Sequence, residues 1–431
     1  PEPQGEGWWR VTASAVYAGE NSSMATTTSV QRTRLTGLGQ TSDPAGGGAS
    51  LGLLTSESVS LDLLGNETVS RSYVARAAKT VTQIVTFPDS TNEAVTVSVN
   101  DLLVSSTSKT GVRTDFAHDA IERPVRAETA GGTRSVASVT HYNARGQVAW
   151  TEDAAGNRTT FAYDPETGRQ IATTDPVTGT VFTAYDVRGN DVAAWGATYP
   201  VLKEFDDFNR QTASYTLRDP NLSLASFADF CSNVESFDKT TWLYDEATGL
   251  LTNKLYADAK GPRYTYSADG KLLTRTWARL MTNGLPLVTT YSYTDTGEML
   301  GIDYSDETPD VSFALDRLGR QVTVTDATGT RAFTYNDALQ LAAETNVMGE
   351  ITRSYDALGR NTGFTINPSL PSYSVLYSFD DLGRFSSLFS LVNGAPHSWT
   401  YSYLPGSDLL SGISNGAFQI TRTYEPNRDL L

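Results

Sequence analysis

One short phrase recurs about every twenty residues through most of this 431-residue chain. It consists of an aromatic residue, an acid, two variable residues, a glycine and a polar residue, as in Tyr355-Asp356-Ala357-Leu358-Gly359-Arg360. A period of this size indicates that one supersecondary unit is stacked many times. Because a catalytic residue is needed only once, repetition on this scale favours a scaffold.

The repeats are followed by their lead residues, which are Tyr142, Tyr163, Tyr185, Phe205, Tyr244, Tyr266, Tyr293, Leu315, Tyr335, Tyr355, Phe379, Tyr403 and Tyr424. The step from Phe205 to Tyr244 is about double the others. Within it, residues 222–230 have a weak helical spacing with a helix start at Asp219-Pro220. We therefore predict a repeat array over 111–431 with an irregular insertion at about 215–240.

The phrase has a direct reading as a turn. An Asp at the first position accepts a hydrogen bond from the backbone two residues later, and a Gly at the fourth adopts the left-handed conformation, which gives a type I turn with a G1 bulge. Asn209 replaces the glycine with a tolerant residue, whereas Glu122 marks a degenerate copy. We predict structural roles for the repeat residues Tyr142, Gly146, Tyr163, Asp164, Gly168, Arg169, Tyr185, Asp186, Gly189, Tyr244, Asp245, Gly249, Asp316, Gly319, Arg320, Tyr355, Asp356, Gly359, Arg360, Asp380, Gly383 and Arg384.

A second turn signal lies halfway between these turns, at Asp153–Asn157, Asp175–Gly179, Asp326–Gly329 and Asn346–Gly349. The residues between turns alternate large and small side chains, which indicates strands. The predicted fold is all-β: about forty short strands in one antiparallel meander. An open sheet of that size curls, so we expect a spiral shell with its aromatic face inward, its centre either hollow or filled by side chains.

Residues 1–110 keep the chemistry of strands but lose the regular period. Segments 81–87 and 94–99 flank a turn and indicate a hairpin, and Leu61–Asn66 is an early echo of the phrase. Residues 43–52 are rich in Gly and Ser and indicate a loop. We expect an N-terminal β region with degenerate repeats, either continuous with the array or forming a small flanking module.

Composition limits the partners and cofactors. The net charge of -16 disfavours nucleic-acid binding and is explained by the solubility of a large surface. A single cysteine, Cys231, excludes an internal disulfide and a cysteine metal cluster, and the three histidines lack ligand spacing. The densest acidic run, formed by Asp303, Asp306, Glu307 and Asp310, is read as a solvated loop rather than a metal site. We predict no cofactor, no metal and no catalytic residue.

The tryptophans offer an alternative reading as a carbohydrate-stacking platform; they are Trp8, Trp9, Trp150, Trp195, Trp242, Trp277 and Trp399. Most occupy alternating strand positions, so packing is the favoured interpretation.

The chain has no apolar stretch long enough to span a membrane and no recognisable signal peptide. It ends within the repeat that begins at Tyr424, so we expect a segment of a longer polypeptide.

The repeat resembles the tyrosine-aspartate (YD) repeats of bacterial Rhs proteins, insecticidal toxin-complex shells and teneurins. The matches are carried by residues 142–147, 163–169, 185–190, 315–320, 355–360 and 379–384. The resemblance implies a spiral of β-hairpins that encloses a C-terminal toxic effector in the bacterial members and belongs to an adhesion ectodomain in teneurins. The aspartate autoproteolysis motif of the effector-carrying members is absent from this sequence, as is any cargo after Tyr424.

The favoured hypothesis is a noncatalytic shell segment that encapsulates or displays a polypeptide, such as a C-terminal effector, not present in this chain. The alternative is a secreted or cell-surface adhesion or glycan-binding protein, whose partners would be glycans or cell-surface proteins. A polysaccharide-active enzyme is a more distant alternative. Through the resemblance, the expected location is extracellular or at the cell surface.

Overall fold

The structure is a computed structural model of the chain, and it describes residues 2–4, 7–17, 25–36, 38, 51–131, 134–217, 225–233, 236–367, 373–392 and 394–425. In the first part of the chain, the strands and one 3-10 helix are β1 (Glu2–Gln4), β2 (Gly7–Val16), β3 (Thr26–Arg34), β4 (Leu53–Leu61), β5 (Glu67–Ala75), η1 (Arg76–Ala78), β6 (Thr80–Thr86), β7 (Glu93–Val99), β8 (Leu102–Thr107), β9 (Arg113–His118), β10 (Pro124–Gly131) and β11 (Arg134–Tyr142).

The middle of the chain contains β12 (Val148–Glu152), β13 (Arg158–Tyr163), β14 (Gln170–Asp175), β15 (Gly179–Tyr185), β16 (Asp191–Gly196), β17 (Val201–Phe205), β18 (Gln211–Leu217), α1 (Phe227–Ser232), β19 (Phe237–Tyr244), β20 (Leu251–Leu255), β21 (Arg263–Tyr266), β22 (Leu272–Leu280), β23 (Pro286–Tyr293) and β24 (Met299–Tyr304). The last part contains β25 (Val311–Leu315), β26 (Gln321–Asp326), β27 (Gly329–Tyr335), β28 (Leu341–Asn346), β29 (Gly349–Tyr355), β30 (Asn361–Asn367), β31 (Tyr373–Phe379), β32 (Phe385–Val392), β33 (Ala395–Tyr403), β34 (Leu410–Ser414) and β35 (Gln419–Thr421).

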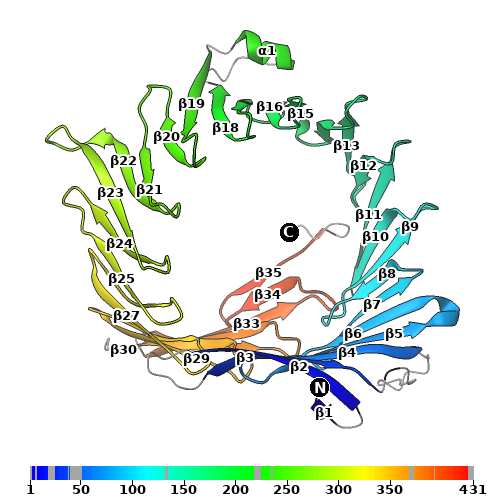
Figure 1. Cartoon of the computed structure of the whole chain (residues 1–431). Coiled ribbons are helices and arrows are strands. Elements are labelled where there is room, and N and C mark those ends of the chain that lie inside the picture. Colours follow the sequence, from blue (N-terminus) through cyan, green and yellow to red (C-terminus); the bar gives the residue numbers. More distant parts are fainter. Residues whose placement is uncertain are drawn as a thin grey trace.

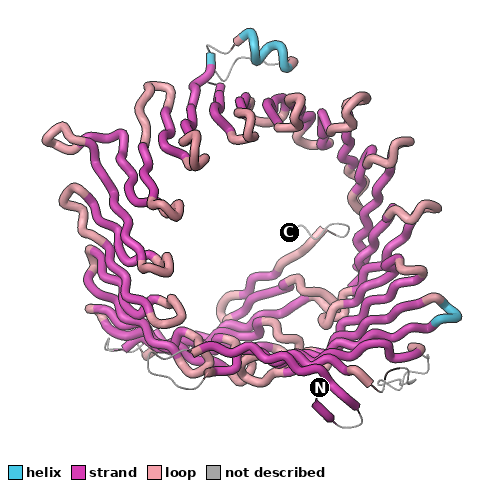
Figure 2. Tube along the Cα trace, viewed as in Figure 1, coloured by secondary structure: helices cyan, strands magenta, loops and turns pink. Residues whose placement is uncertain are grey.

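These strands form one 35-stranded antiparallel sheet within the described residues. Its hydrogen-bonded pairs join strands that are neighbours in sequence, from β1 with β2 to β34 with β35. The all-β antiparallel meander predicted from the sequence is therefore confirmed. Figure 1 shows the ribbon bending round an open centre, and Figure 2 shows the same course to be almost entirely strand and turn.

Because every strand reverses the chain, the turns fall on two opposite edges of the ribbon. We call the edge that carries the repeated phrase the YD rim; its turns follow odd-numbered strands, as between β29 and β30. The turns that follow even-numbered strands form the opposite rim, as at Asp326–Gly329 between β26 and β27. Each rim thus receives one of the two turn signals that the sequence contains.

The ribbon continues past one full circuit, so its later part contacts its beginning. The Asn66 side-chain amide donates to the carbonyl of Ala357, 291 residues away, at 3.3 Å. The Thr110 hydroxyl bonds the carboxylate of Asp408, 298 residues away, at 3.1 Å. In Figure 1, the part of the ribbon around β29 overlaps β3 in the view. Contacts at this nearly constant separation define a spiral, as the sequence predicted.

The wall is one sheet thick, so few side chains are fully buried. One buried cluster lies on β16 to β19 and contains Ala193, Trp195, Leu202, Ala213, Tyr215, Leu217 and Phe237. A smaller one joins Leu54, Tyr73 and Ile84 on β4, β5 and β6. Most other strand residues are half-buried, because no second layer covers them among the described residues. Cohesion must therefore come largely from contacts between neighbouring hairpins.

The N-terminal hairpin predicted at 81–87 and 94–99 is present as β6 and β7. Pairing of β8 with β9 carries the sheet across residues 110 and 111, and the division into two regions at that point stays a prediction. The predicted loop at 43–52 lies, up to residue 50, outside the described residues.

The insertion predicted at about 215–240 falls between β18 and β19, which still pair through Leu217 and Phe237. Helix α1 begins at Phe227, within the segment that has helical spacing, whereas the predicted start at Asp219-Pro220 lies outside the described residues. Helices long and apolar enough to cross a lipid bilayer are absent from the described parts of the chain.

Candidate functional site

Each YD turn is organised by its aspartate. In the turn between β29 and β30, one oxygen of the Asp356 carboxylate accepts from the backbone N–H groups of Leu358 and Arg360, at 3.0 and 2.9 Å. The other oxygen accepts from Nε of Arg360 at 2.7 Å. The backbone N–H of Gly359 bonds the Asp356 carbonyl, with Gly359 at a φ of 78°. One carboxylate thus holds both the reversal and the arginine that follows it.

The same arrangement recurs at the other predicted repeat positions. Asp316 with Arg320 and Asp380 with Arg384 reproduce the three bonds of Asp356. Asp186 uses Asn190 in place of an arginine. Asp164 and Asp245 belong to turns one residue longer, and each accepts from the backbone and hydroxyl of a threonine. Left-handed φ values occur at Gly146, Gly168, Gly189, Gly249, Gly319 and Gly383.

The lead tyrosine links each repeat to the one before it. The Tyr355 hydroxyl donates to the carbonyl of Leu341 at 2.8 Å, and Leu341 is the first strand residue after the preceding YD turn. The same bond is made by Tyr142, Tyr163, Tyr185, Tyr244, Tyr266, Tyr293, Tyr335, Tyr403 and Tyr424. We call this series of turns and tyrosines the ladder.

A cation lies over the ring of many lead residues. The guanidinium of Arg320 lies 3.9 Å from the centre of the Tyr335 ring, and that of Arg384 lies 4.3 Å from Tyr403. Arg360 covers Phe379 in the same way. An arginine from one repeat thus lies between its own turn and the ring of the next repeat, because the side chain after each glycine points along the ribbon.

Partial burial raises the pKa of the Tyr403 hydroxyl, although the nearby Arg384 acts in the opposite direction. The hydroxyl therefore stays protonated at neutral pH and can donate to the Phe385 carbonyl. For Asp356, partial burial opposes ionisation, but the bonds from Arg360 and the backbone lower its pKa on balance. Both groups are thus held in the protonation state that the ladder requires.

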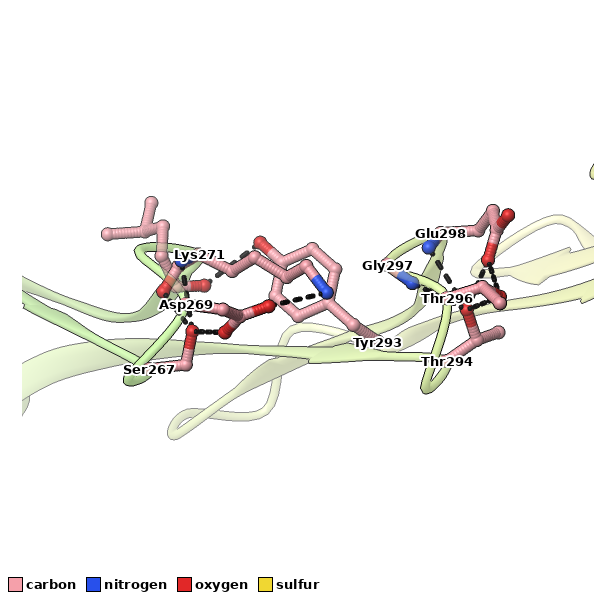
Figure 3. Close-up of polar contacts among 9 residues, drawn as sticks. Ser267, Asp269, Lys271, Tyr293, Thr294, Thr296, Gly297 and Glu298 are labelled. Carbon is pink, nitrogen blue, oxygen red and sulfur yellow. Dashed lines mark hydrogen bonds and ion pairs between the residues drawn. The ribbon is translucent and has the colours of Figure 1, made fainter.

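Two consecutive turns show how the sequence varies without loss of the geometry (Figure 3). Ser267 and Thr294 stand in place of the aspartate: Ser267 accepts from the backbone N–H of Lys271, and Thr294 accepts from two backbone N–H groups of its own turn. Hydrogen bonds from Lys271 and Ser267 lower the pKa of Asp269 to about 2. Those from Thr294 and Thr296 lower the pKa of Glu298 to about 2. Tyr293 still bonds the Leu272 carbonyl between these turns.

A second link joins neighbouring YD turns through the polar residue that follows the glycine. The side-chain amides of Gln147 and Gln340 donate to the carbonyls of Gly168 and Gly359, each at 2.8 Å. The guanidinium of Arg169 likewise donates to the next turn, at the backbone carbonyl of Asp186, at 2.7 Å. The available signal was the long polar residue after each glycine. Its partner lies in the next repeat, so the contact could be found only from the spacing of hairpins in space.

In the YD turns that follow β9, β17 and β27, a residue other than glycine occupies the left-handed fourth position. Asn209 has a φ of 61°, as expected for a tolerant substitute. Glu122 has a φ of 70°, and its turn keeps the hydrogen bonds of the regular copies, so this copy is degenerate in sequence but not in geometry. Leu339, at 62°, was not anticipated. A branched side chain in this conformation is strained, and the surrounding ladder holds it there.

The other candidate groups do not converge. In the described residues, no group of three His, Cys, Asp or Glu could hold a metal ion. Within the acidic run, Asp310 accepts from the backbone of Tyr304, while Asp306 accepts from Thr308 and lies 3.8 Å from Arg279. Cys231 is exposed on α1. A surface hollow of about 930 Å³ lies on the opposite rim beside Asp306, Glu307 and Met281.

Several tryptophan rings are covered by other side chains. Trp150 is stacked on His141 at 5.0 Å and lies under the Arg158 guanidinium at 3.9 Å. Trp195 is buried against Phe182. Trp277 lies 3.6 Å from the Arg275 guanidinium and Trp242 lies near Lys254. By contrast, Trp8 is 50% exposed.

Comparison with models of known protein families found no match, and comparison with curated proteins found none either. Among solved structures, the chain is similar to a chain of the Photorhabdus luminescens Tc holotoxin pore with a mutated TccC3, at 13% identity and a TM-score of 0.41. It is also similar to a chain of the TcdB2-TccC3-Cdc42 crystal structure, at 13% identity and 0.43, and of the TcdB2-TccC3 crystal structure, at 14% and 0.44.

Each of these matches covers 94% of this chain, but only 26 to 28% of the neighbour. The chain thus corresponds to a minor part of the length of those proteins. Similarity at this level does not assign the chain to a family.

Proposed function

We propose that this chain is a noncatalytic wall segment of an Rhs-like shell that encloses or displays a polypeptide. The observation that carries the proposal is that the repeated chemistry is used between hairpins. Asp356 bonds Arg360, Arg360 covers Phe379, and Tyr355 bonds the preceding repeat. Side chains committed in this way hold a thin wall together.

The positions of the first and last strands support containment of a polypeptide that is connected to the C-terminal end of the ribbon. In the view of Figure 1, β35 lies inside the outline of the ring and β1 lies outside it. A polypeptide connected after β35 would start from the inner side in this projection. By the resemblance of the repeats, that polypeptide would be a toxic effector, and the shell would be released from the cell or displayed at its surface.

Protease protection tests this proposal. An unfolded reporter peptide is fused after residue 431, and the same reporter is fused before Pro1 as the matched control. We expect the C-terminal reporter to be cleaved at least tenfold more slowly than the N-terminal one, since a wall excludes the protease from one reporter only. Equal cleavage of the two reporters would contradict containment.

The alternative, glycan binding or adhesion, is favoured by one residue. Trp8 is 50% exposed, whereas a sugar-stacking platform at Trp150 or Trp277 would have to displace the cations already stacked there. This alternative is tested on a glycan array. If the chain is retained on the array and the Trp8→Ala variant is not, the alternative is supported. If the Trp8→Ala variant is still retained, Trp8 is not the binding residue.

The hypothesis of a polysaccharide-active enzyme finds little support at the hollow beside Asp306. A glycosidase acid needs a raised pKa, and hydrogen bonds from Thr308 lower the pKa of Asp306 instead. Incubation of the chain with labelled polysaccharides is expected to release no products.

A further inference from the structure

The two coils of the spiral meet along a seam that joins different rims. On the first coil, the contacting residues lie at turns of the opposite rim, such as Asn66 and Thr110. On the second coil, they lie on YD turns, such as Ala357 and Asp408. Arg317 of a YD turn lies 5.1 Å from the ring of Tyr17 at the end of β2. The seam is thus a row of YD turns resting on the opposite rim one coil earlier.

The seam differs in kind from the joints within a coil. Neighbouring strands share continuous backbone hydrogen bonds, as in the six registered pairs from Glu350 with Asn367 to Tyr355 with Asn361. Across the seam, by contrast, the bonds of Asn66 and Thr110 and the contact of Arg317 with Tyr17 are isolated side-chain contacts. A row of separate surface contacts is weaker than a backbone ladder, so the two joints differ in stability.

Glycines permit the close approach of the coils. A Cβ at Gly131 would lie 1.9 Å from the carbonyl oxygen of Gly406, and one at Gly383 would lie 2.5 Å from the Asp89 carboxylate. At Gly270, a YD-turn glycine away from the seam, a Cβ would meet no atom within 4 Å. The seam glycines therefore serve a steric purpose in addition to the needs of their own turns.

We propose that the seam is a separable joint, at which the coils part while the sheet of each coil stays folded, and that Gly131 and Gly406 set its closure. The proposal goes beyond the proposed function, since the joint would open whether or not the ribbon encloses a polypeptide. The spiral then resists deformation where strands are paired within a coil and deforms most easily across the seam, where the coils separate.

Distances between spin labels test the proposal in a Cys231→Ser background. Labels are placed across the seam with Thr91→Cys and Asp381→Cys, both exposed, on turns beside Asp89 and Gly383. The control pair is Val187→Cys and Phe208→Cys, exposed on adjacent YD turns of one coil. Gly131→Ala is the test substitution, because Gly131 lies outside the left-handed region and alanine adds no backbone strain there.

We expect Gly131→Ala to raise the population of long seam distances severalfold, with the control distances and the far-ultraviolet circular dichroism unchanged. Gly156→Ala, at a glycine with open space around it, is expected to leave the seam distances unchanged. The proposal is overturned if Gly131→Ala leaves the seam distances unchanged, or if seam and control distances change together. Should Gly131→Ala fail to fold, Asp408→Ala, which removes the bond to Thr110, is measured against the same criteria.

Discussion

The two rims of the ribbon are built from similar turns but differ in what those turns contact. On the YD rim, Asp380 fixes Arg384, and Arg384 reaches both the Tyr403 ring and the Ser407 carbonyl of the next repeat. On the opposite rim, Asp175 caps its own turn through Val177 and Thr178. That rim also carries helix α1 and the surface hollows. Cohesion is concentrated on one rim, which leaves the other free to vary.

The largest expected effect is a loss of stability in acid, which acts mainly on the YD rim. Carboxylates with lowered pKa lie mostly on the YD rim and include Asp164, Asp186, Asp245, Asp269, Glu298, Asp316, Asp356 and Asp380. Because their pKa values are higher in the unfolded chain, the unfolded chain binds more protons in acid. Stability should be constant above about pH 5 and fall as the pH is lowered through about 4 toward 2.

Thermal melts from pH 7 to pH 2 measure this effect. The melting temperature is expected to decline steeply only below about pH 4.5. A melting temperature that stays level down to pH 2 would show that the carboxylates do not hold the turns.

The next largest effect is expected from a single aspartate on the YD rim. Asp356→Ala removes the carboxylate that accepts from two backbone N–H groups and from the Arg360 side chain. We therefore expect the free energy of unfolding to fall by about 2 kcal/mol. The matched control is Asp175→Ala on the opposite rim, with a distinctly smaller loss. Urea unfolding of both variants gives the comparison, and equal losses would remove the distinction between the rims.

Loss of one ladder hydroxyl should cost less. Tyr403→Phe removes the bond to the Phe385 carbonyl but keeps the ring under Arg384, so we expect a loss of about 1 kcal/mol. Tyr256→Phe is the control, since that ring is 45% exposed on the opposite rim. A Tyr403→Phe variant as stable as the control would place the ladder's cohesion in the rings rather than in the hydroxyls.

The smallest change is an expected gain. Leu339→Gly relieves the left-handed strain at a φ of 62°, and the higher entropy of glycine in the unfolded chain offsets part of it, leaving about 0.5 to 1 kcal/mol of added stability. Glu122→Gly is the companion variant at the same turn position. Calorimetry gives the melting temperatures of both variants. If neither melting temperature rises, the turn does not impose the left-handed conformation on these residues.

Much of the fold could be predicted from the sequence, because the residues that determine each turn and strand act over a short range. Asp356 and Gly359 specify their turn within five residues, and the alternation before Tyr355 specifies the strand that precedes it. Copies that lack the expected residue, such as Leu339, show that neighbouring hairpins can impose the same geometry on an unsuited residue. Sequence alone could not reveal that conformation, because the strain is offset outside the turn.

The sequence by itself determined the two alternating turn signals, the single antiparallel meander and the need of so long a sheet to curl. Only the tertiary structure decided that Arg384 lies over Tyr403 and that the Asn66 amide meets Ala357 one coil later. The physical reason is range: turn chemistry acts over a few residues, whereas these partners depend on hairpin spacing and on a curvature summed over nearly three hundred residues.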